Sequence, residues 1–179
     1  MTKESYPYTP FYCEENIWHL CQLPQLSSDG KVVLISNKLR SCPLWKQRAG
    51  AGPEQFVVWD YHVVLLHRDG LWQVWDLDST LGMPADFRPY MQATFKFGAL
   101  ALNDHAPQFR VLDAQEYLSC LSSDRSHMRN ADGTWQAPPP TWPIIQAGGE
   151  PNLMQLIDMT RPDPGTVMSM VEFSSAYLP

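Results

Sequence analysis

The apolar residues near the start of the chain recur with the spacing of a helix. Positions i, i+4, i+7 and i+8 of one helical face are occupied by Cys13, Ile17, Leu20 and Cys21. Two glutamates directly after Cys13 would lie in the first turn, where negative charge complements the helix dipole. Pro24 then stops the pattern. We therefore predict a helix that begins at Cys13 and ends near Gln22.

Runs of β-branched and aromatic residues predict strands further along the chain. The longest run, 56–67 (FVVWDYHVVLLH), is followed by a turn at 68–70 (RDG) and a returning strand at 71–76 (LWQVWD). The segment 31–36 (KVVLIS) fits either a strand or the end of an apolar helix. The two runs around the turn predict an antiparallel hairpin.

The remaining predicted elements are shorter. Asp113 and Glu116 have the spacing of a capping box and predict a helix at 114–122, and Asn152 is expected to cap a helix at 153–159. Further strands are expected at 108–112 and 166–173, and loops at 37–55, 81–88, 123–129 and 138–140. This mixture indicates an α+β fold, and the length suits a single domain over residues 1–179.

The hairpin also makes a specific prediction about two side chains. Gly70 suits the last position of a three-residue loop, which needs the left-handed conformation. With that loop His62 stands opposite Asp76, where an imidazole and a carboxylate can bond. A two-residue loop would put the two side chains on opposite faces. The prediction therefore depends on the length of the loop.

Cys13, His62 and Asp76 together have the composition of a thiol catalytic triad. A cysteine at a helix amino terminus is expected to have a lowered thiol pKa and more thiolate. Each feature also has a structural alternative: a buried cysteine that acts as a small hydrophobe, and a cross-strand His–Asp pair that only stabilises the sheet. The chain order Cys, His, Asp is that of papain-like and transglutaminase-like hydrolases.

Composition and charge exclude other classes. The net charge of −6 and the pI of about 5.2, without a basic stripe, disfavour nucleic-acid binding. The four cysteines show no C-x-x-C spacing, which argues against a structural zinc site. No run of eighteen apolar residues and no signal peptide is visible, so we expect no membrane association and a cytoplasmic location with free thiols.

Several longer strings are similar to one known family. They are YCEENIW at 12–18, WDYHV at 59–63, WDLD at 75–78, and SDRSHM at 123–128, with the prolines at 138–140 after them. In these strings the chain resembles the protein N-terminal glutamine amidohydrolases, in order from about residue 8 to 173. The resemblance implies a papain/transglutaminase-like core in which the Cys13 helix packs on an antiparallel sheet.

The resemblance also implies an activity. Cys13, His62 and Asp76 would be the triad of an enzyme that converts an N-terminal glutamine to glutamate and releases ammonia through a thioester. The expected partners are proteins or peptides with an unblocked N-terminal Gln, and we expect a monomer with neither a cofactor nor a metal. In a eukaryote the product would enter the N-degron pathway, and the protein could then also be nuclear.

Selectivity for a chain terminus needs a group that reads the substrate's ammonium. The candidates from the sequence are the carboxylates of Glu14, Glu15, Asp78 and Asp124. His127 is an alternative base. Two other readings of the whole chain stay open: another cysteine hydrolase, either a protease or a deamidase of internal glutamines, and a non-catalytic binder of peptide N-termini.

Overall fold

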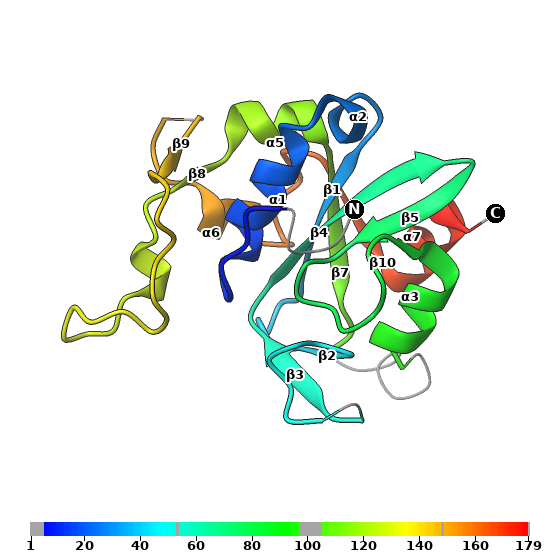
Figure 1. The fold of residues 1–179 in the computed structure, drawn as a ribbon, viewed down its shortest axis with the longest axis horizontal. Helices are drawn as coiled ribbons and strands as arrows, with labels where there is room; N and C mark the ends of the chain where they lie inside the picture. The colour runs from blue at the N-terminus through cyan, green and yellow to red at the C-terminus, as the bar shows by residue number, and fades with distance from the viewer. Residues whose placement is uncertain (1–5, 53, 97–104, 148, 179) are drawn as a thin grey trace.

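A central antiparallel sheet organises the molecule. The computed structural model describes residues 6–52, 54–96, 105–147 and 149–178. In the sheet the strand order is β10-β7-β1-β4-β5-β6, and every neighbouring pair is antiparallel (Figure 1). The strands are β1 (Lys31–Ser36), β4 (His62–Asp69), β5 (Leu71–Trp75), β6 (Ala85–Asp86), β7 (Gln108–Asp113) and β10 (Thr166–Ser169).

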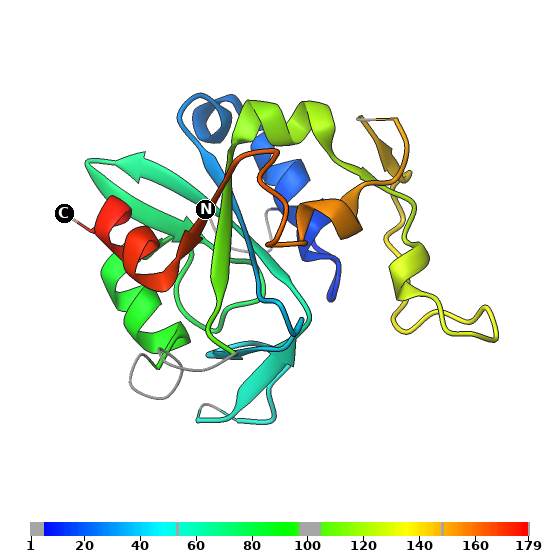
Figure 2. The same ribbon diagram turned by 180° about the vertical axis from the view of Figure 1, so that it is seen from behind.

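Helices cover both faces of this sheet, because its inner strands are apolar on both sides. Val32 and Val63 face one core, whereas their chain neighbours Val33 and Val64 face the other. Figures 1 and 2 show α1 and α5 over one face and α3 and α7 over the other. The helices are α1 (Cys13–Cys21), α2 (Pro24–Ser27), α3 (Phe87–Thr94), α5 (Ala114–Cys120), α6 (Leu153–Leu156) and α7 (Met170–Tyr177). The mixed α/β architecture and the N-terminal helix agree with the predicted α+β class, and the relation to papain and transglutaminase stays a prediction.

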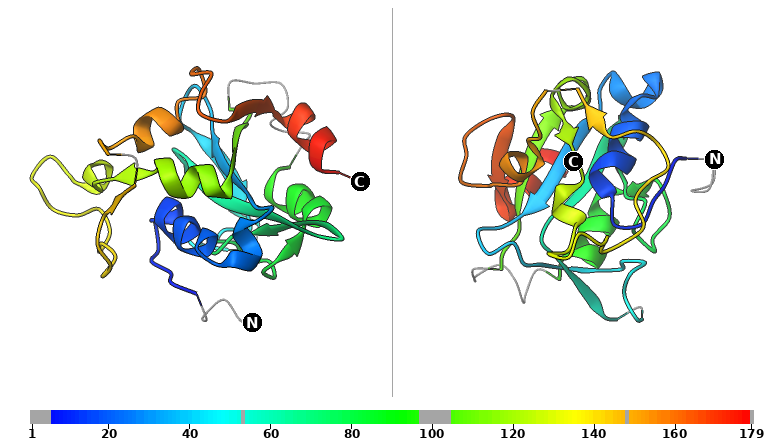
Figure 3. Two further views of the ribbon diagram at one scale, coloured as in Figure 1. Left: turned by 90° about the horizontal axis from the view of Figure 1, so that it is seen from above. Right: turned by 90° about the vertical axis from the view of Figure 1, so that its left-hand side faces the viewer.

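Smaller elements lie beside the main sheet. β2 (Cys42–Trp45) pairs with β3 (Phe56–Trp59), and β8 (Ser122–Ser123) pairs with β9 (Ile145–Gln146). A short 3₁₀ helix, η2 (Ser126–Met128), follows β8. The chain between β8 and β9 extends away from the sheet on the side of α1, as Figure 1 and the left view of Figure 3 show.

The predicted hairpin exists, but its register was wrong. Gly70 has a φ of 69° and alone turns the chain, so that Asp69 pairs with Leu71 and Leu65 with Trp75. This shifts the ladder by two residues from the predicted one. A shift by an even number keeps side chains on the same face. Because β5 ends at Trp75, the following chain is free to turn its first residue, Asp76, towards His62.

The predicted strand at 56–67 was also wrong, because it is two strands in two sheets. β3 ends at Trp59 and β4 begins at His62. In the break, the main-chain N–H of Tyr61 donates to the carboxylate of Asp60 at 2.9 Å, and the hydroxyl of Ser36 donates to the Asp60 carbonyl at 2.7 Å. These bonds replace ladder bonds, and the break places His62 at the first position of a strand.

Other predicted elements need correction where side chains find partners far away in sequence. Asp113 precedes α5 but makes no cap bond, because it pairs with Lys31. Asn152 precedes α6, yet its side chain bonds to the carbonyl of Cys120 instead. The predicted strand at 166–173 ends at Ser169, which forms a capping box with Glu172 and starts α7. Within segments predicted as loops the structure forms β2, β6 and the start of α3.

Candidate active site

Cys13 is the first residue of α1, as predicted, and its sulfur meets the start of β4. The side chain is 6% exposed. The main-chain N–H of Val63 is close enough to the sulfur to lower the pKa of the thiol. Val63 directly follows His62, so the fold brings the predicted nucleophile to the residue beside the predicted base.

The expected lowering of the Cys13 thiol pKa was wrong. Burial raises this pKa well above its ordinary value, and the nearby carboxylates of Glu14 and Asp78 raise it further, while the Val63 N–H lowers it. Desolvation of the thiolate outweighs the field of the helix terminus here. The resting sulfur is therefore a neutral thiol that needs a base to take its proton.

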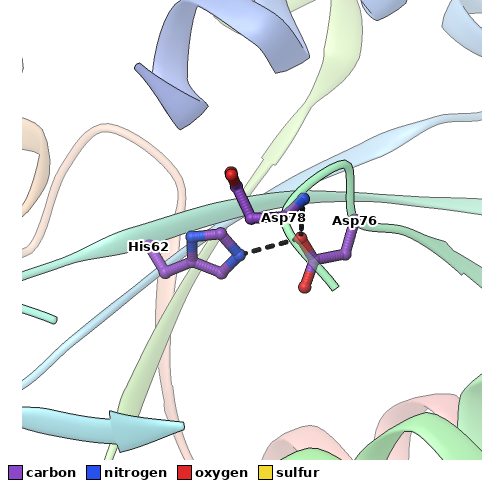
Figure 4. A group of neighbouring side chains, drawn as sticks. All are labelled: His62, Asp76 and Asp78. Atoms are coloured by element: carbon purple, nitrogen blue, oxygen red, sulfur yellow. Dashed lines mark hydrogen bonds and ion pairs between the residues drawn. The ribbon is translucent and has the colours of Figure 1, made fainter. Parts of the chain in front are cut away.

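His62 and Asp76 are in direct contact, as the hairpin argument predicted. The Nε2 atom of His62 lies 3.0 Å from Oδ1 of Asp76, and the two side chains are 1% and 2% exposed (Figure 4). The other ring nitrogen, Nδ1, is buried and has no hydrogen-bond partner among the described residues. With the Nε2 proton donated to Asp76, Nδ1 carries the free lone pair of the ring.

Asp76 is held by donors from three segments of the chain. The hydroxyl of Tyr90 on α3 donates to Oδ2 at 2.8 Å, and Nε2 of Gln47 lies 3.4 Å from the same oxygen. The main-chain N–H of Asp78 donates to Oδ1 at 2.9 Å. These bonds stabilise the ionised carboxylate and fix its direction. The ring of Trp59 stacks on His62 with centroids 5.7 Å apart, which restricts the imidazole as well.

The pKa values of this pair move apart. Burial alone would lower the pKa of His62, but the charge of Asp76 and its hydrogen bond outweigh burial, so the pKa is raised. Burial would raise the pKa of Asp76, yet the attraction of His62 and the bonds from Tyr90 and Gln47 leave it lowered. The carboxylate is thus ionised across the neutral range, and it stabilises an imidazolium at His62.

Cys13 opens into a cleft of about 350 Å³. Its other lining residues are Phe11, Arg40, Val58, Trp59, Asp60, Tyr61, His127, Met128 and Gln136. A second hollow of about 220 Å³ adjoins it, because Phe11 and Trp59 line both, and Asp78 lines the second. A small ligand can therefore reach the sulfur from solvent.

Glu14 lies fully buried beside the nucleophile. Its Oε2 is 4.0 Å from the Cys13 sulfur and accepts a hydrogen bond from the hydroxyl of Tyr61 at 2.9 Å. His127 approaches the same group, with Nε2 3.0 Å from the Tyr61 oxygen and 3.6 Å from Oε1 of Glu14. Burial and the charge of Glu15 raise the Glu14 pKa to about 8, against the lowering effect of its hydrogen bonds.

The other candidate carboxylates also have partners within the protein. Oδ1 of Asp78 accepts the hydroxyl of Tyr8 at 2.7 Å. Asp124 is exposed and accepts the main-chain N–H of Ser126 at 2.9 Å. None of Glu14, Glu15, Asp78 and Asp124 is among the described side chains that line the Cys13 cleft. Their role in substrate binding stays a prediction.

Glu15 forms a buried ion pair. Nε and one terminal nitrogen of Arg125 donate to its two oxygens at 2.7 and 2.8 Å, and the indole N–H of Trp142 donates at 2.6 Å. Arg125 also donates to the carbonyls of Trp142 and Pro143. The pair joins α1 to the segment between β8 and β9, which carries His127.

We expect Glu15→Gln to lower the free energy of unfolding by about 3–5 kcal/mol, because it leaves the buried Arg125 without its counter-charge. For a chain of this size the thermal midpoint should fall by about 10 °C. The control is Glu54→Gln, which breaks exposed ion pairs to Lys46 and Lys96. It should leave the midpoint unchanged. Equal midpoints for both variants would contradict a structural role for Glu15.

One group of side chains has the proximity of metal ligands. Atoms of His62, Asp76 and Asp78 lie within 4.8 Å of one another. In this group Oδ1 of Asp76 already bonds to His62 and accepts the main-chain N–H of Asp78. We therefore assign no metal there, and the metal-free site stays a prediction.

In the part of the chain that the structure describes, no helix combines the length and the apolar character needed to span a bilayer.

The sequence did not predict the partners that hold the pair. Gln47 lies in a segment expected to be a loop, and Tyr90 lies on a helix that was not predicted. No short-range pattern links either residue to Asp76. Trp59 and Asp60 belong to the WDYHV string. That string was the sequence feature that could have indicated a role for residues next to His62.

Comparison with known proteins supports one family. Residues 8–177 match the model of the N-terminal glutamine amidase family. The chain is 42% identical over 173 residues to a protein N-terminal glutamine amidohydrolase of Caenorhabditis briggsae, covering 94% of this chain and 92% of that protein. The chain is 41% identical over 175 residues to the protein of the same name from Drosophila melanogaster. This match covers 93% of this chain and 85% of the Drosophila protein. The chain therefore belongs to the N-terminal glutamine amidase family of amidohydrolases.

Proposed function

We propose that this protein deamidates the N-terminal glutamine of proteins and peptides with Cys13 as nucleophile, His62 as base and Asp76 as the residue that orients the base. One observation carries the proposal. The buried imidazole of His62 bonds to Asp76 through Nε2 and keeps Nδ1 free, and the thiol that opens into the cleft lies close to Val63, the residue after His62. A free ring nitrogen with an oriented partner is what a general base requires.

The reaction begins with proton transfer from the Cys13 thiol to Nδ1 of His62 as the sulfur attacks the side-chain amide carbon. The first N–H groups of a helix have no partner within it, so the main-chain N–H of Cys13 can donate to the developing oxyanion. The imidazolium then gives its proton to the departing nitrogen, and ammonia and a thioester result. Water that loses a proton to His62 cleaves the thioester, which yields glutamate and the free thiol.

The family resemblance supports further details of this proposal. The substrates are chains with an unblocked N-terminal Gln, and the reaction needs no cofactor. The cytoplasmic location and the monomeric state stay predictions. In a eukaryote the glutamate product would feed the N-degron pathway, and the enzyme could also work in the nucleus.

Ammonia release from three synthetic peptides tests the activity. A peptide that begins with Gln should release ammonia, whereas the same peptide with an acetylated Gln should not. A peptide that begins with Asn should also fail, because its shorter side chain does not bring the amide carbon to the sulfur. Turnover of the acetylated peptide would favour a deamidase of internal glutamines, and cleavage of a peptide bond would favour a protease.

A non-catalytic binder of peptide N-termini is the alternative outside catalysis. It would retain the Gln-initiated peptide without releasing ammonia. The buried Nδ1 of His62 disfavours this reading, since binding alone gives no reason to bury a base without a partner.

A further inference from the structure

Among the described residues that line the Cys13 cleft, only Asp60 carries a carboxylate. We propose that Asp60 binds the protonated α-amino group of the substrate and so selects an N-terminal glutamine over an internal one. The inference rests on the proposed function and names the residue that reads the amine.

The fold holds Asp60 ready for a ligand. Asp60 lies in the break between β3 and β4, where Oδ1 accepts the main-chain N–H of Tyr61 and the main-chain carbonyl accepts the hydroxyl of Ser36. Oδ2 has no hydrogen-bond partner, and no lysine or arginine forms an ion pair with the carboxylate, within the described ranges. The residue is exposed. A fixed carboxylate with one unused oxygen binds a cation with little loss of side-chain entropy.

The position of Asp60 also fits the shape of the substrate. Asp60 and Cys13 line the same cleft, and the charge of Asp60 is close enough to contribute to the raised pKa of Cys13 and of Glu14. In glutamine only Cα, Cβ and Cγ separate the α-amino nitrogen from the amide carbon. A substrate whose amide carbon contacts the sulfur must therefore place its ammonium within the same cleft.

The alternative carboxylates are less suited to an incoming ammonium. Glu14 is fully buried behind the hydroxyl of Tyr61, and Glu15 is neutralised by Arg125. Asp78 lies in the adjoining hollow with Oδ1 occupied by Tyr8. An acetylated or internal glutamine has a neutral amide in place of the ammonium, so it cannot form a charge-assisted bond with the carboxylate of Asp60. Such loss of a charge-assisted bond discriminates strongly.

The test compares Asp60→Asn with wild type on two peptides. The first begins with Gln, and the second is identical but has hydrogen in place of the α-amino group. Asparagine keeps the oxygen that accepts the Tyr61 N–H, so the fold should persist. For the first peptide we expect kcat/KM to fall about 10- to 100-fold, mainly through KM, because a charge-assisted bond is lost. For the second peptide the variant and wild type should be equal.

The control is Asp132→Asn. Asp132 is also exposed, and its Oδ1 accepts the main-chain N–H of Thr134 at 3.0 Å, but it does not line the cleft. This control should match wild type on both peptides. Equal losses on both peptides for Asp60→Asn, or a selective loss in Asp78→Asn instead, would overturn the inference. Absence of ammonia release from wild type would instead overturn the proposed function, so the two failures are distinguishable.

Discussion

Cys13→Ala should abolish ammonia release from a Gln-initiated peptide, with a loss in kcat of about 10⁴-fold or more, because no other group can form the thioester. The protein should remain folded, since the substitution removes only one buried atom from the end of α1. Ammonia release under saturating peptide measures the loss, and far-ultraviolet circular dichroism checks the fold. An intact protein mass that gains the substrate acyl group in wild type, and not in the variant, would identify the thioester directly.

Cys21→Ala is the matched control for this experiment. Cys21 is the last residue of the same helix and is also a buried free thiol, and it packs in the same core as Cys13. Its loss should lower stability slightly and leave kcat within about twofold of wild type. Retained activity in Cys13→Ala would remove this thiol from the mechanism, whatever the behaviour of Cys21→Ala.

The sequence could predict the helix and the hairpin that place the proposed triad because their signals are local. The apolar positions from Cys13 to Cys21 have helical spacing, and the helix has those bounds. The His62–Asp76 contact was predicted from a wrong register, and it survived because the error was an even number of residues. The face of a strand is more robust to such an error than the pairing itself. The break before His62 could not be predicted, since FVVWDYHVVLLH has no glycine or proline.

The pKa shifts at the site depend on residues distant in the sequence, so they could not be predicted from the sequence. The helix terminus suggested a lowered pKa for the Cys13 thiol, but burial and the charges of Glu14 and Asp78 raise this pKa instead. Tyr90 reaches Asp76 from a helix that was not predicted, and Gln47 reaches it from a segment predicted as a loop. Such contacts depend on tertiary packing, which overrides local propensity. The family strings pointed to Cys13, His62 and Asp76 as candidates, but they did not indicate which groups contact these side chains.

Asp76→Asn should lower kcat/KM by about 10³- to 10⁴-fold while the protein stays folded, because the imidazole loses its orientation and counter-charge. The asparagine amide can donate to Nε2, and the ring proton then moves to Nδ1. That nitrogen could no longer accept the proton of Cys13. The loss should appear mainly in kcat, since the substrate does not contact Asp76.

The pH dependence separates this role from a merely structural one. In wild type the raised pKa of His62 places the acid limb of kcat/KM above pH 6.5, the ordinary value for histidine, because the base must be neutral to act. Without the Asp76 charge, burial dominates and the limb should shift to lower pH. The same pKa shift makes folding stability depend on pH. Because the pKa of His62 is higher in the folded than in the unfolded state, protonation of His62 stabilises the fold below about pH 6.5. This contribution is lost as the pH rises through the pKa of the folded state. Tyr90→Phe removes one donor to Asp76 and keeps the His62 contact. It should therefore lower kcat/KM about tenfold or less and leave the acid limb of the pH profile nearly unshifted. An unshifted acid limb in Asp76→Asn would show that Asp76 does not control the protonation of His62.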